Sequence, residues 1–380
     1  MKPRFIFIFI GILLAYGAIA FYIGWNGWMF LSALLGLEHA GVYAVCFGIV
    51  AFSYLIGRAA YGTPLRPAAV ALKLIGSYWF AVLEYALLIL PIADVVALLL
   101  RAAGASESVY IIGVGGIAFL LMAALILRGS WNAWSPVVRT YRVQVPKRAG
   151  ELDKLTIAMA SDLHLGTVVG NRHLGRLVDI VERMKPDLIL LPGDILDDDI
   201  EPFLRKNMSA VLGKLKAPLG VYAVTGNHEY IGRKVPEFIA AMDAIGIRVL
   251  MDEAELVGGS FYVIGRKDKA SAGFGGEARK PIRELVAPLD RSLPLILLDH
   301  QPSDLAGAAE QGIDLSVSGH THRGQMMPNH LITRRLFELD WGYLKKGGLH
   351  AVVSSGFGTW GPPVRIGSRS EVIRIEVEFG

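Results

Sequence analysis

The stretch Thr156-Ile-Ala-Met-Ala-Ser-Asp162-Leu-His164 decides the fold of the larger part of this 380-residue chain. An apolar run of strand length ends here in a carboxylate and an imidazole, two groups that bind metal ions. Four further apolar runs end in the same way, before Gly193-Asp194, Gly226-Asn227-His228-Glu229, Asp299-His300 and Gly319-His320-Thr-His322. Amphipathic segments that favour helices, among them residues 203–215, separate the runs, which predicts an α/β domain. In such domains sites form beyond the carboxyl ends of the strands, so we expect all five motifs to line one pocket.

The side chains of these motifs are suited to hard or borderline divalent metals such as manganese, iron or zinc, because they offer carboxylate, imidazole and amide donors. The only cysteine, Cys46, lies in an apolar stretch, which excludes disulfides and cysteine-type zinc sites. A single Gly-Asp or Gly-Asn-His is more often a turn than a site. Five such motifs in sequence, each after a strand, predict a metal centre.

In this order the motifs resemble those of the calcineurin-like metallophosphoesterase family, from about Lys154 to the C-terminus. Three segments resemble its membrane-associated bacterial branch: Leu298-Asp-His-Gln-Pro302, Gly319-His-Thr-His-Arg-Gly-Gln325 and Gly356-Phe-Gly-Thr-Trp-Gly-Pro-Pro-Val-Arg365. The resemblance implies an αββα four-layer sandwich. It also implies hydrolysis of a phosphoester or pyrophosphate bond by water activated between two divalent metal ions.

The resemblance further implies a role for each motif residue. One metal would be held by Asp162, His164 and His322, the other by Asn227, His300 and His320, with Asp194 between them. His228 would protonate the leaving oxygen or stabilise developing charge; the alternative is that it only orients a ligand.

Two arginines are candidate substrate contacts. Arg323 stands where the branch usually has glycine, and its guanidinium is expected either to bind a substrate phosphate or to point to solvent. Arg365 is the second candidate anion contact, and a structural salt bridge is its alternative. The Gly-, Lys- and Arg-rich residues 265–283 are expected to form a mobile loop near the substrate entrance.

The N-terminal third of the chain is strongly apolar. Hydrophobic residues make up 53% of the sequence, the mean hydropathy is +0.44, and the excess precedes residue 130. We expect a transmembrane domain over residues 1–130, a juxtamembrane linker over 131–153 with a first strand at 137–145, and the catalytic domain over 154–380. About four membrane helices are predicted, at residues 5–24, 40–57, 74–100 and 109–127. Residues 25–37 are expected to lie at the membrane interface, and three later spans argue that the first run is not a cleaved signal peptide.

The distribution of basic residues predicts the orientation in a cell inner membrane or plasma membrane. Residues 1–150 hold 11 Lys or Arg and 4 Asp or Glu, whereas the remainder holds 27 and 30. One side of the membrane would carry Lys2, Arg4 and the basic residues around Arg58 and Arg128. The positive-inside rule places this side, and with it both chain ends and the catalytic domain, in the cytoplasm. Two crossings within residues 74–100 would invert this. Because the basic excess flanks spans, no nucleic-acid partner is expected.

Three functions stay open at this point. The first is hydrolysis of a membrane-associated or lipid-linked phosphorylated substrate, with membrane lipids as neighbours. The second is a membrane-tethered phosphatase or phosphodiesterase for soluble nucleotides or phosphoproteins. The third is a non-enzymatic membrane sensor that binds metal, which the complete set of ligand-type residues disfavours.

Overall fold

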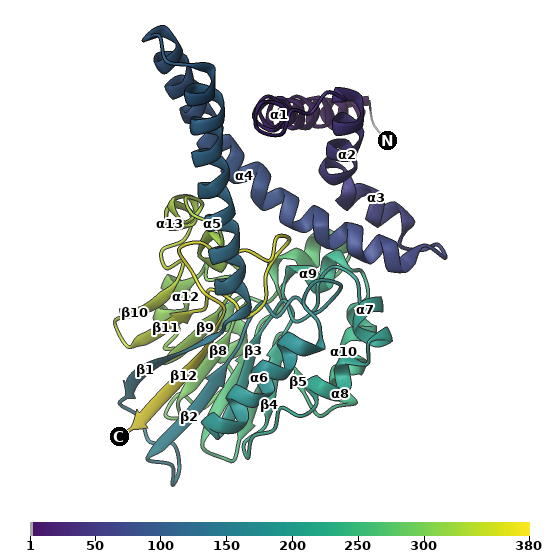
Figure 1. The fold of residues 1–380 in the computed structure, drawn as a ribbon. Coiled ribbons are helices and arrows are strands. Elements are labelled where there is room, and N and C mark those ends of the chain that lie inside the picture. Colours follow the sequence, from purple (N-terminus) through teal and green to yellow (C-terminus); the bar gives the residue numbers. More distant parts are fainter. Residues whose placement is uncertain (1–2) are drawn as a thin grey trace. The chain divides into compact units, whose positions relative to one another are not determined.

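A computed structural model of the chain describes residues 3–380, which form two compact units (Figure 1). One unit holds the N-terminal residues up to Ser130 together with Gly361–Val364, and the other holds Trp131–Trp360 with Arg365–Gly380. Lys2, part of the predicted orientation signal, lies outside the described residues.

The first unit is helical, as its composition predicts. Its helices are α1 (Pro3–Leu35), α2 (Ala40–Ala51), α3 (Ser53–Ala60), α4 (Arg66–Ala102), a π-helix (Ser108–Gly113) and most of α5 (Val114–Trp134). Within the described part, three stretches are long and apolar enough to cross a membrane: Ile10–Leu35, Arg66–Ala102 and Ser108–Trp134. The pair α2 and α3 bends by 60° and makes a fourth if it crosses as one. Residues 25–35 continue α1 instead of forming a separate interfacial segment, because no proline interrupts the helix.

The second unit contains two six-stranded sheets, which confirms the predicted α/β class (Figure 1). The first has the order β1 (Val137–Val145), β12 (Glu371–Phe379), β2 (Lys154–Met159), β3 (Leu188–Pro192), β4 (Val221–Val224) and β5 (Arg248–Val249). The second has the order β10 (Gly342–Lys346), β11 (Leu349–Val353), β9 (Leu315–Ser318), β8 (Leu295–Leu298), β7 (Phe261–Gly265) and β6 (Glu253–Val257).

Helices cover the outer face of each sheet, which gives the predicted αββα layers. Leu190 and Val224 of the first sheet pack with Leu298 and Val317 of the second in one core between the sheets. The first sheet is covered by α6 (Asn171–Met184), α7 (Glu201–Arg205), α8 (Met208–Leu212) and α10 (Val235–Asp243), and the second by α11 (Ile282–Val286) and α12 (Leu305–Glu310). Strands covered on both faces are apolar throughout, which is why the sequence shows continuous runs.

Two segments contain local structure that the sequence pattern does not indicate. Residues 203–215, which we expect to form one helix, divide into α7 and α8 at Asn207, whose φ is +48°. Residues 265–283, predicted as a mobile loop near the substrate entrance, contain a 3₁₀-helix (Lys269–Phe274). Arg266 and Arg279 of this segment pair with buried Asp299 at 3.1 and 2.9 Å.

The register shows at which end the chain enters the sheets. β12 pairs antiparallel with β2, and Ile373 lies opposite Met159, the last residue of β2. β1 runs parallel to β12, and its first residue Val137 lies opposite Glu371. The first strand therefore begins at the same end of the sheet at which β2 ends.

The last residues of α5 belong to the second unit and are fixed to that end of its sheets. The Asn132 side chain donates to the Arg365 carbonyl at 2.9 Å, and the Ser370 amide donates to the Asn132 carbonyl at 3.1 Å. The Trp134 ring packs edge-on against His173 of α6, with centroids 5.0 Å apart. The residues that link α5 to β1 are thus held at this end of the sheets.

Candidate metal centre

The structure brings together all eight side chains that the sequence predicts for the site. Asp162 and His164 follow β2, Asp194 follows β3, and His300 follows β8. Asn227 and His228 begin the short helix α9 (Asn227–Ile231) after β4, and His320 and His322 follow β9. All lie at the carboxyl ends of their strands, as expected for an α/β site.

Asp162, His164 and His322 form one cluster of possible metal ligands. Nε2 of His164 lies 3.0 Å from Nε2 of His322, which lies 3.5 Å from Oδ1 of Asp162. The other oxygen of Asp162 accepts from the Ser161 hydroxyl, and its Oδ1 also accepts from the His320 amide at 2.9 Å. These bonds fix the carboxylate plane.

Asp194, His300 and His320 form a second cluster, with Asn227 beside it. Oδ1 of Asn227 lies 2.9 Å from Nδ1 of His320 and 3.3 Å from Nε2 of His300. Oδ2 of Asp194 lies 3.1 Å from Nε2 of His300 and 3.9 Å from Nε2 of His164. Asp194 therefore faces both clusters.

The donor set fits bound divalent cations. Nitrogen and oxygen lone pairs face one another at 3.0 to 3.5 Å in a buried site, where only a shared proton or a cation relieves their repulsion. Burial lowers the pKa of His164 and of His320 to about 3, so both rings are neutral, as metal ligands must be. Nδ1 of His300 donates to the Pro192 carbonyl at 2.9 Å, so Nε2 is the ring atom that faces the cluster, 3.1 Å from Oδ2 of Asp194.

The backbone at these strand ends is unusual. Five of the seven predicted ligands have a positive φ between +46° and +71°, a region that side chains other than glycine rarely adopt: Asp162, His164, Asp194, His320 and His322. Such strain persists only where the surrounding structure imposes it, and it concentrates at functional sites.

Two glycines leave the room that the carboxylates occupy. A Cβ on Gly226 would lie 2.1 Å from Oδ1 of Asp194, and a Cβ on Gly319 would lie 2.1 Å from Oδ2 of Asp162. The glycines of these motifs are therefore required by close packing against the site.

His228 is buried at the edge of the cluster. Its Nδ1 lies 2.7 Å from Oδ1 of Asp198, and its ring packs edge-on against His164 with centroids 4.6 Å apart. Burial lowers the pKa of His228, but the hydrogen bond to Asp198 and the charge of Asp194 outweigh it and raise the pKa to about 9. The ring can therefore carry a proton at neutral pH.

Two acidic groups, to which the sequence reasoning assigned no role, support the site. The buried carboxylate of Glu229 accepts from the backbone amides of Gly226 at 2.7 Å and Leu196 at 2.9 Å, and from the Asp194 amide at 3.2 Å. Its position three residues after Gly226 is the spacing of a helix capping box, which was the available signal. For Asp198, the partner of His228, the acidic run 197–199 was the one signal that the sequence offered.

The two predicted anion contacts, Arg323 and Arg365, differ in their exposure and in their partners. The Arg323 guanidinium stacks on the Trp341 ring, 3.9 Å from its centroid, and stays partly exposed. Arg365 is fully buried and donates to the carbonyls of Gly356 at 3.2 Å and Gly358 at 2.6 Å. Its Nη2 also lies 3.3 Å from Nδ1 of His322, so Arg365 fixes the C-terminal loop behind a predicted ligand.

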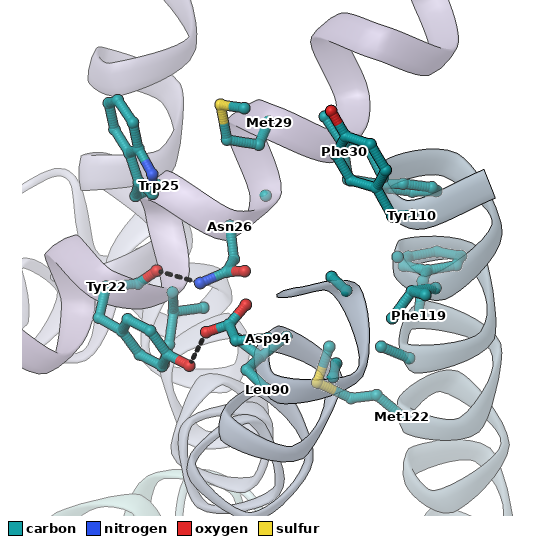
Figure 2. Close-up of a pocket in the computed structure, with 18 of the residues that line it drawn as sticks. Tyr22, Trp25, Asn26, Met29, Phe30, Leu90, Asp94, Tyr110, Phe119 and Met122 are labelled. Atoms are coloured by element: carbon teal, nitrogen blue, oxygen red, sulfur yellow. Dashed lines mark hydrogen bonds between the residues drawn. The ribbon is translucent and has the colours of Figure 1, made fainter. Parts of the chain in front are cut away.

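The membrane unit contains a cavity of about 520 Å³ (Figure 2). The Tyr22 hydroxyl donates to the Asp94 carboxylate at its polar side, and Phe30 and Met122 line its apolar side. Phe119 of the lining is more than half exposed, so the cavity opens toward the surroundings of the helices. None of the predicted site residues lines it, and Asp94 has the polar partner that a carboxylate in a span requires.

Comparison with known proteins identifies relatives of the second unit and of the chain as a whole. The sequence profile of the calcineurin-like phosphoesterases matches residues 155–324. An uncharacterized metallophosphoesterase of Aquifex aeolicus is 32% identical over 250 residues, which are 63% of this chain and 94% of the relative. A transmembrane protein with metallophosphoesterase domain of Bos taurus is 28% identical over 366 residues, 91% of this chain and 79% of the relative. A solved dimetal phosphatase of Danio rerio is similar with a TM-score of 0.36 at 14% identity, over 53% of this chain and 87% of the other.

Proposed function

The chain belongs to the calcineurin-like metallophosphoesterases, a family of phosphoester hydrolases, and on this premise we propose that it is a membrane-anchored dimetal enzyme that cleaves a lipid-linked phosphoester or pyrophosphate. One observation carries the membrane part of the proposal. The chain passes from α5 to β1 within two residues, and β1 begins at the end of the sheet that bears the metal centre. A substrate whose lipid part stays in the bilayer would present its phosphate at that end.

The proposed ligands are the seven side chains of the two clusters. Asp162, His164 and His322 would hold one ion, and Asn227, His300 and His320 the other; Asp194, which faces both clusters, would bridge them. Bound divalent ions supply Lewis-acid activation of water and neutralise charge on the phosphoryl oxygens.

The protonated ring of His228 has a defined task in this proposal. Its Nδ1–H is directed to Asp198, so Nε2–H is the proton available for the leaving oxygen. As the phosphorus–oxygen bond breaks, that oxygen takes the Nε2 proton and leaves as a hydroxyl group. Asp198 would then stabilise the proton that remains on Nδ1.

Arg323 is proposed as the contact to a second phosphate or to a headgroup oxygen. It follows His322 directly, and its guanidinium plane is held by Trp341, which reduces the entropy lost when it binds an anion. Arg365 is assigned instead to positioning, since it is fully buried and its Nη2 donates to two carbonyls of the C-terminal loop.

The catalytic unit is proposed to face the cytoplasm. Arg128 at the end of the last span and the basic residues after it, through Arg148, follow the positive-inside rule. The orientation is tested with the variant Leu256→Cys, in which Cys46→Ser removes the native thiol. Intact cells that express it are treated with a membrane-impermeant thiol reagent. Labelling of residue 256 without cell lysis would contradict the orientation.

The function is tested with the full chain in lipid nanodiscs. Protein loaded with manganese, iron or zinc is offered an aryl phosphate monoester, an aryl phosphodiester and a lipid-linked nucleotide. We expect metal-dependent hydrolysis, with the highest kcat/KM for the lipid-linked substrate. Hydrolysis that survives both chelation and Asp194→Ala would refute the dimetal mechanism, and equal kcat/KM for soluble nucleotides would refute the lipid-linked substrate.

A further inference from the structure

The helix α13 (His330–Leu336) exposes apolar side chains on the catalytic unit. Leu331, Ile332 and Leu336 are 56%, 59% and 71% exposed, and Trp360 on the neighbouring loop is 60% exposed. Single exposed apolar residues are ordinary, but a group of large ones on adjoining segments marks an interaction surface.

This surface lies at the metal-centre end of the unit. Helix α13 follows the His320-Thr-His322 motif closely, and the Phe337 ring after it packs against His320 with centroids 5.9 Å apart. Trp360 is held beside the same loop, because its amide and carbonyl both bond to the Gln325 side chain at 2.9 Å.

The helix has an inner polar side and an outer apolar and basic side. Thr333 turns inward, where its hydroxyl donates to Asp340 at 2.7 Å. Ile332 and Leu336 lie one turn apart on the outside, as do Leu331 and Arg335. Arg334 and Arg335 are both exposed beside these apolar residues.

We infer that this outer side of α13, with Trp360, docks on a bilayer surface that contains anionic lipids. The side combines large apolar residues, two arginines and an exposed tryptophan, which is the composition of segments that lie in the headgroup region. The inference rests on the proposed function in one respect, namely that the metal-centre end faces the membrane.

The covalent path from the span supports a bilayer as the occupant. Trp134 ends a helix that can cross a membrane, and Val137 begins the first strand at the metal-centre end. Hydrogen bonds through Asn132 hold the last turn of that helix to this end of the unit. A bilayer around the span is therefore within reach of the segments at this end.

Fluorescence quenching in nanodiscs tests the docking without reference to activity. A bimane label is placed by Ile332→Cys, or by Leu256→Cys as the matched control, in the full chain with Cys46→Ser. Leu256 is also exposed, but it pairs with Tyr262 near the start of β7, at the end of the sheet opposite the metal centre. We expect lipids with a headgroup nitroxide to quench residue 332 several-fold more than residue 256, and anionic lipid to increase the difference.

Other results have equally definite meanings. Equal quenching at the two positions would overturn the inference, and so would self-quenching between two labelled copies in one disc, which would make the face a contact between copies. Quenching at residue 332 in a protein that hydrolyses no phosphoester would retain the docking surface while refuting the proposed function.

A substitution provides a second measurement. Leu336→Glu should lower kcat/KM for a lipid-linked substrate about tenfold and leave that for an aryl phosphate unchanged, because the side chain of residue 336 is 71% exposed and residue 336 is not among the proposed ligands. Unchanged rates on both substrates would also count against the inference.

Discussion

Asp194 faces both ligand clusters of the proposed metal centre. Its carboxylate lies 3.1 Å from His300 and accepts the His228 amide at 2.9 Å, while its own amide is held by Glu229. Replacement by a neutral group of the same size therefore removes one negative charge without opening a large cavity.

We expect Asp194→Asn to lose at least one metal ion per chain and about 10³-fold in kcat/KM, which corresponds to about 4 kcal/mol. Metal content by mass spectrometry and steady-state kinetics on an aryl phosphate check this. Full metal content with normal kinetics would remove Asp194 from the site.

His228→Ala should act on proton transfer and leave metal binding intact. Loss of a general acid typically lowers the rate 10²–10⁴-fold. The loss should be large for an alkyl leaving group and small for nitrophenol, which leaves without a proton. A series of substrates graded by leaving-group pKa measures this, and a uniform loss across the series would indicate that His228 only positions other residues.

The sequence predicted the residues that carry the donor atoms better than the residues that hold them in place. The eight motif residues stand directly after apolar strands, so their position is a local signal. Glu229 accepts from the amide of Leu196 and Asp198 binds the ring of His228, and such contacts depend on how separate loops meet. Arg365 could not be placed because its partners are loop carbonyls.

Strand ends are the elements that shape the centre. Gly226→Ala should distort the β4–α9 turn, since the new Cβ would lie 2.1 Å from Oδ1 of Asp194. We expect a destabilisation of about 1–3 kcal/mol, the usual cost of overpacking, together with loss of metal. Thermal unfolding and metal content check both effects.

Gly175→Ala is the matched control for that variant. Gly175 lies in α6, where a Cβ would meet nothing within 4 Å. The substitution should stabilise the helix by up to about 1 kcal/mol. If both variants behaved alike, the role given to Gly226 would be wrong.

The seam between α5 and α6 should be sensitive to acid. Burial lowers the pKa of His173 to about 4 from an ordinary value of 6.5, against the opposing hydrogen bond to the Phe357 carbonyl. A base with a lowered pKa binds its proton more readily in the unfolded chain. The contribution of neutral His173 to the free energy of unfolding is therefore complete above about pH 6.5. It is lost as the pH falls to about 4, and the loss amounts to up to about 2–3 kcal/mol.

Thermal unfolding of the full chain in nanodiscs at pH 7.5 and pH 5 measures this contribution. His173→Gln removes the titrating group, so the variant should lose less stability than the wild type between the two pH values. An identical loss would show that other groups cause the acid sensitivity.

The sequence predicted the strands and most helices, but not their long-range order. β1 matches its expected range, Val137–Val145, since β-branched residues and alternation are local signals. Its pairing with β12, from the other end of the catalytic unit, leaves no local trace. The break at Asn207 was missed because the apolar spacing of residues 203–215 suits a helix throughout.

The chain as a whole joins spanning helices to a hydrolase fold through a very short connection. The membrane segments were predictable from composition, because a bilayer requires long apolar helices whatever their tertiary contacts. The end at which the chain enters the sheets was not predictable, since it depends on the β1–β12–β2 register. That register places the start of β1 at the end of the sheet where the two ligand clusters lie.

A flexible insertion at the boundary of the two units should separate anchoring from catalysis. Ten Gly-Ser residues between Ser130 and Trp131, where the units divide, would add a reach of about 18 Å and leave residues 132–135 bound to the catalytic unit. We expect kcat/KM for an aryl phosphate to stay within about twofold, and that for a lipid-linked substrate to fall about tenfold, because the site is no longer held in a fixed orientation at the membrane. The same insertion between Gly347 and Gly348 is the control, since it extends the β10–β11 turn at the opposite end of the sheet and should change neither rate. An unaltered lipid-linked rate in the first variant would mean that the short connection merely tethers the enzyme, and the proposal of a membrane-facing metal centre would then fail.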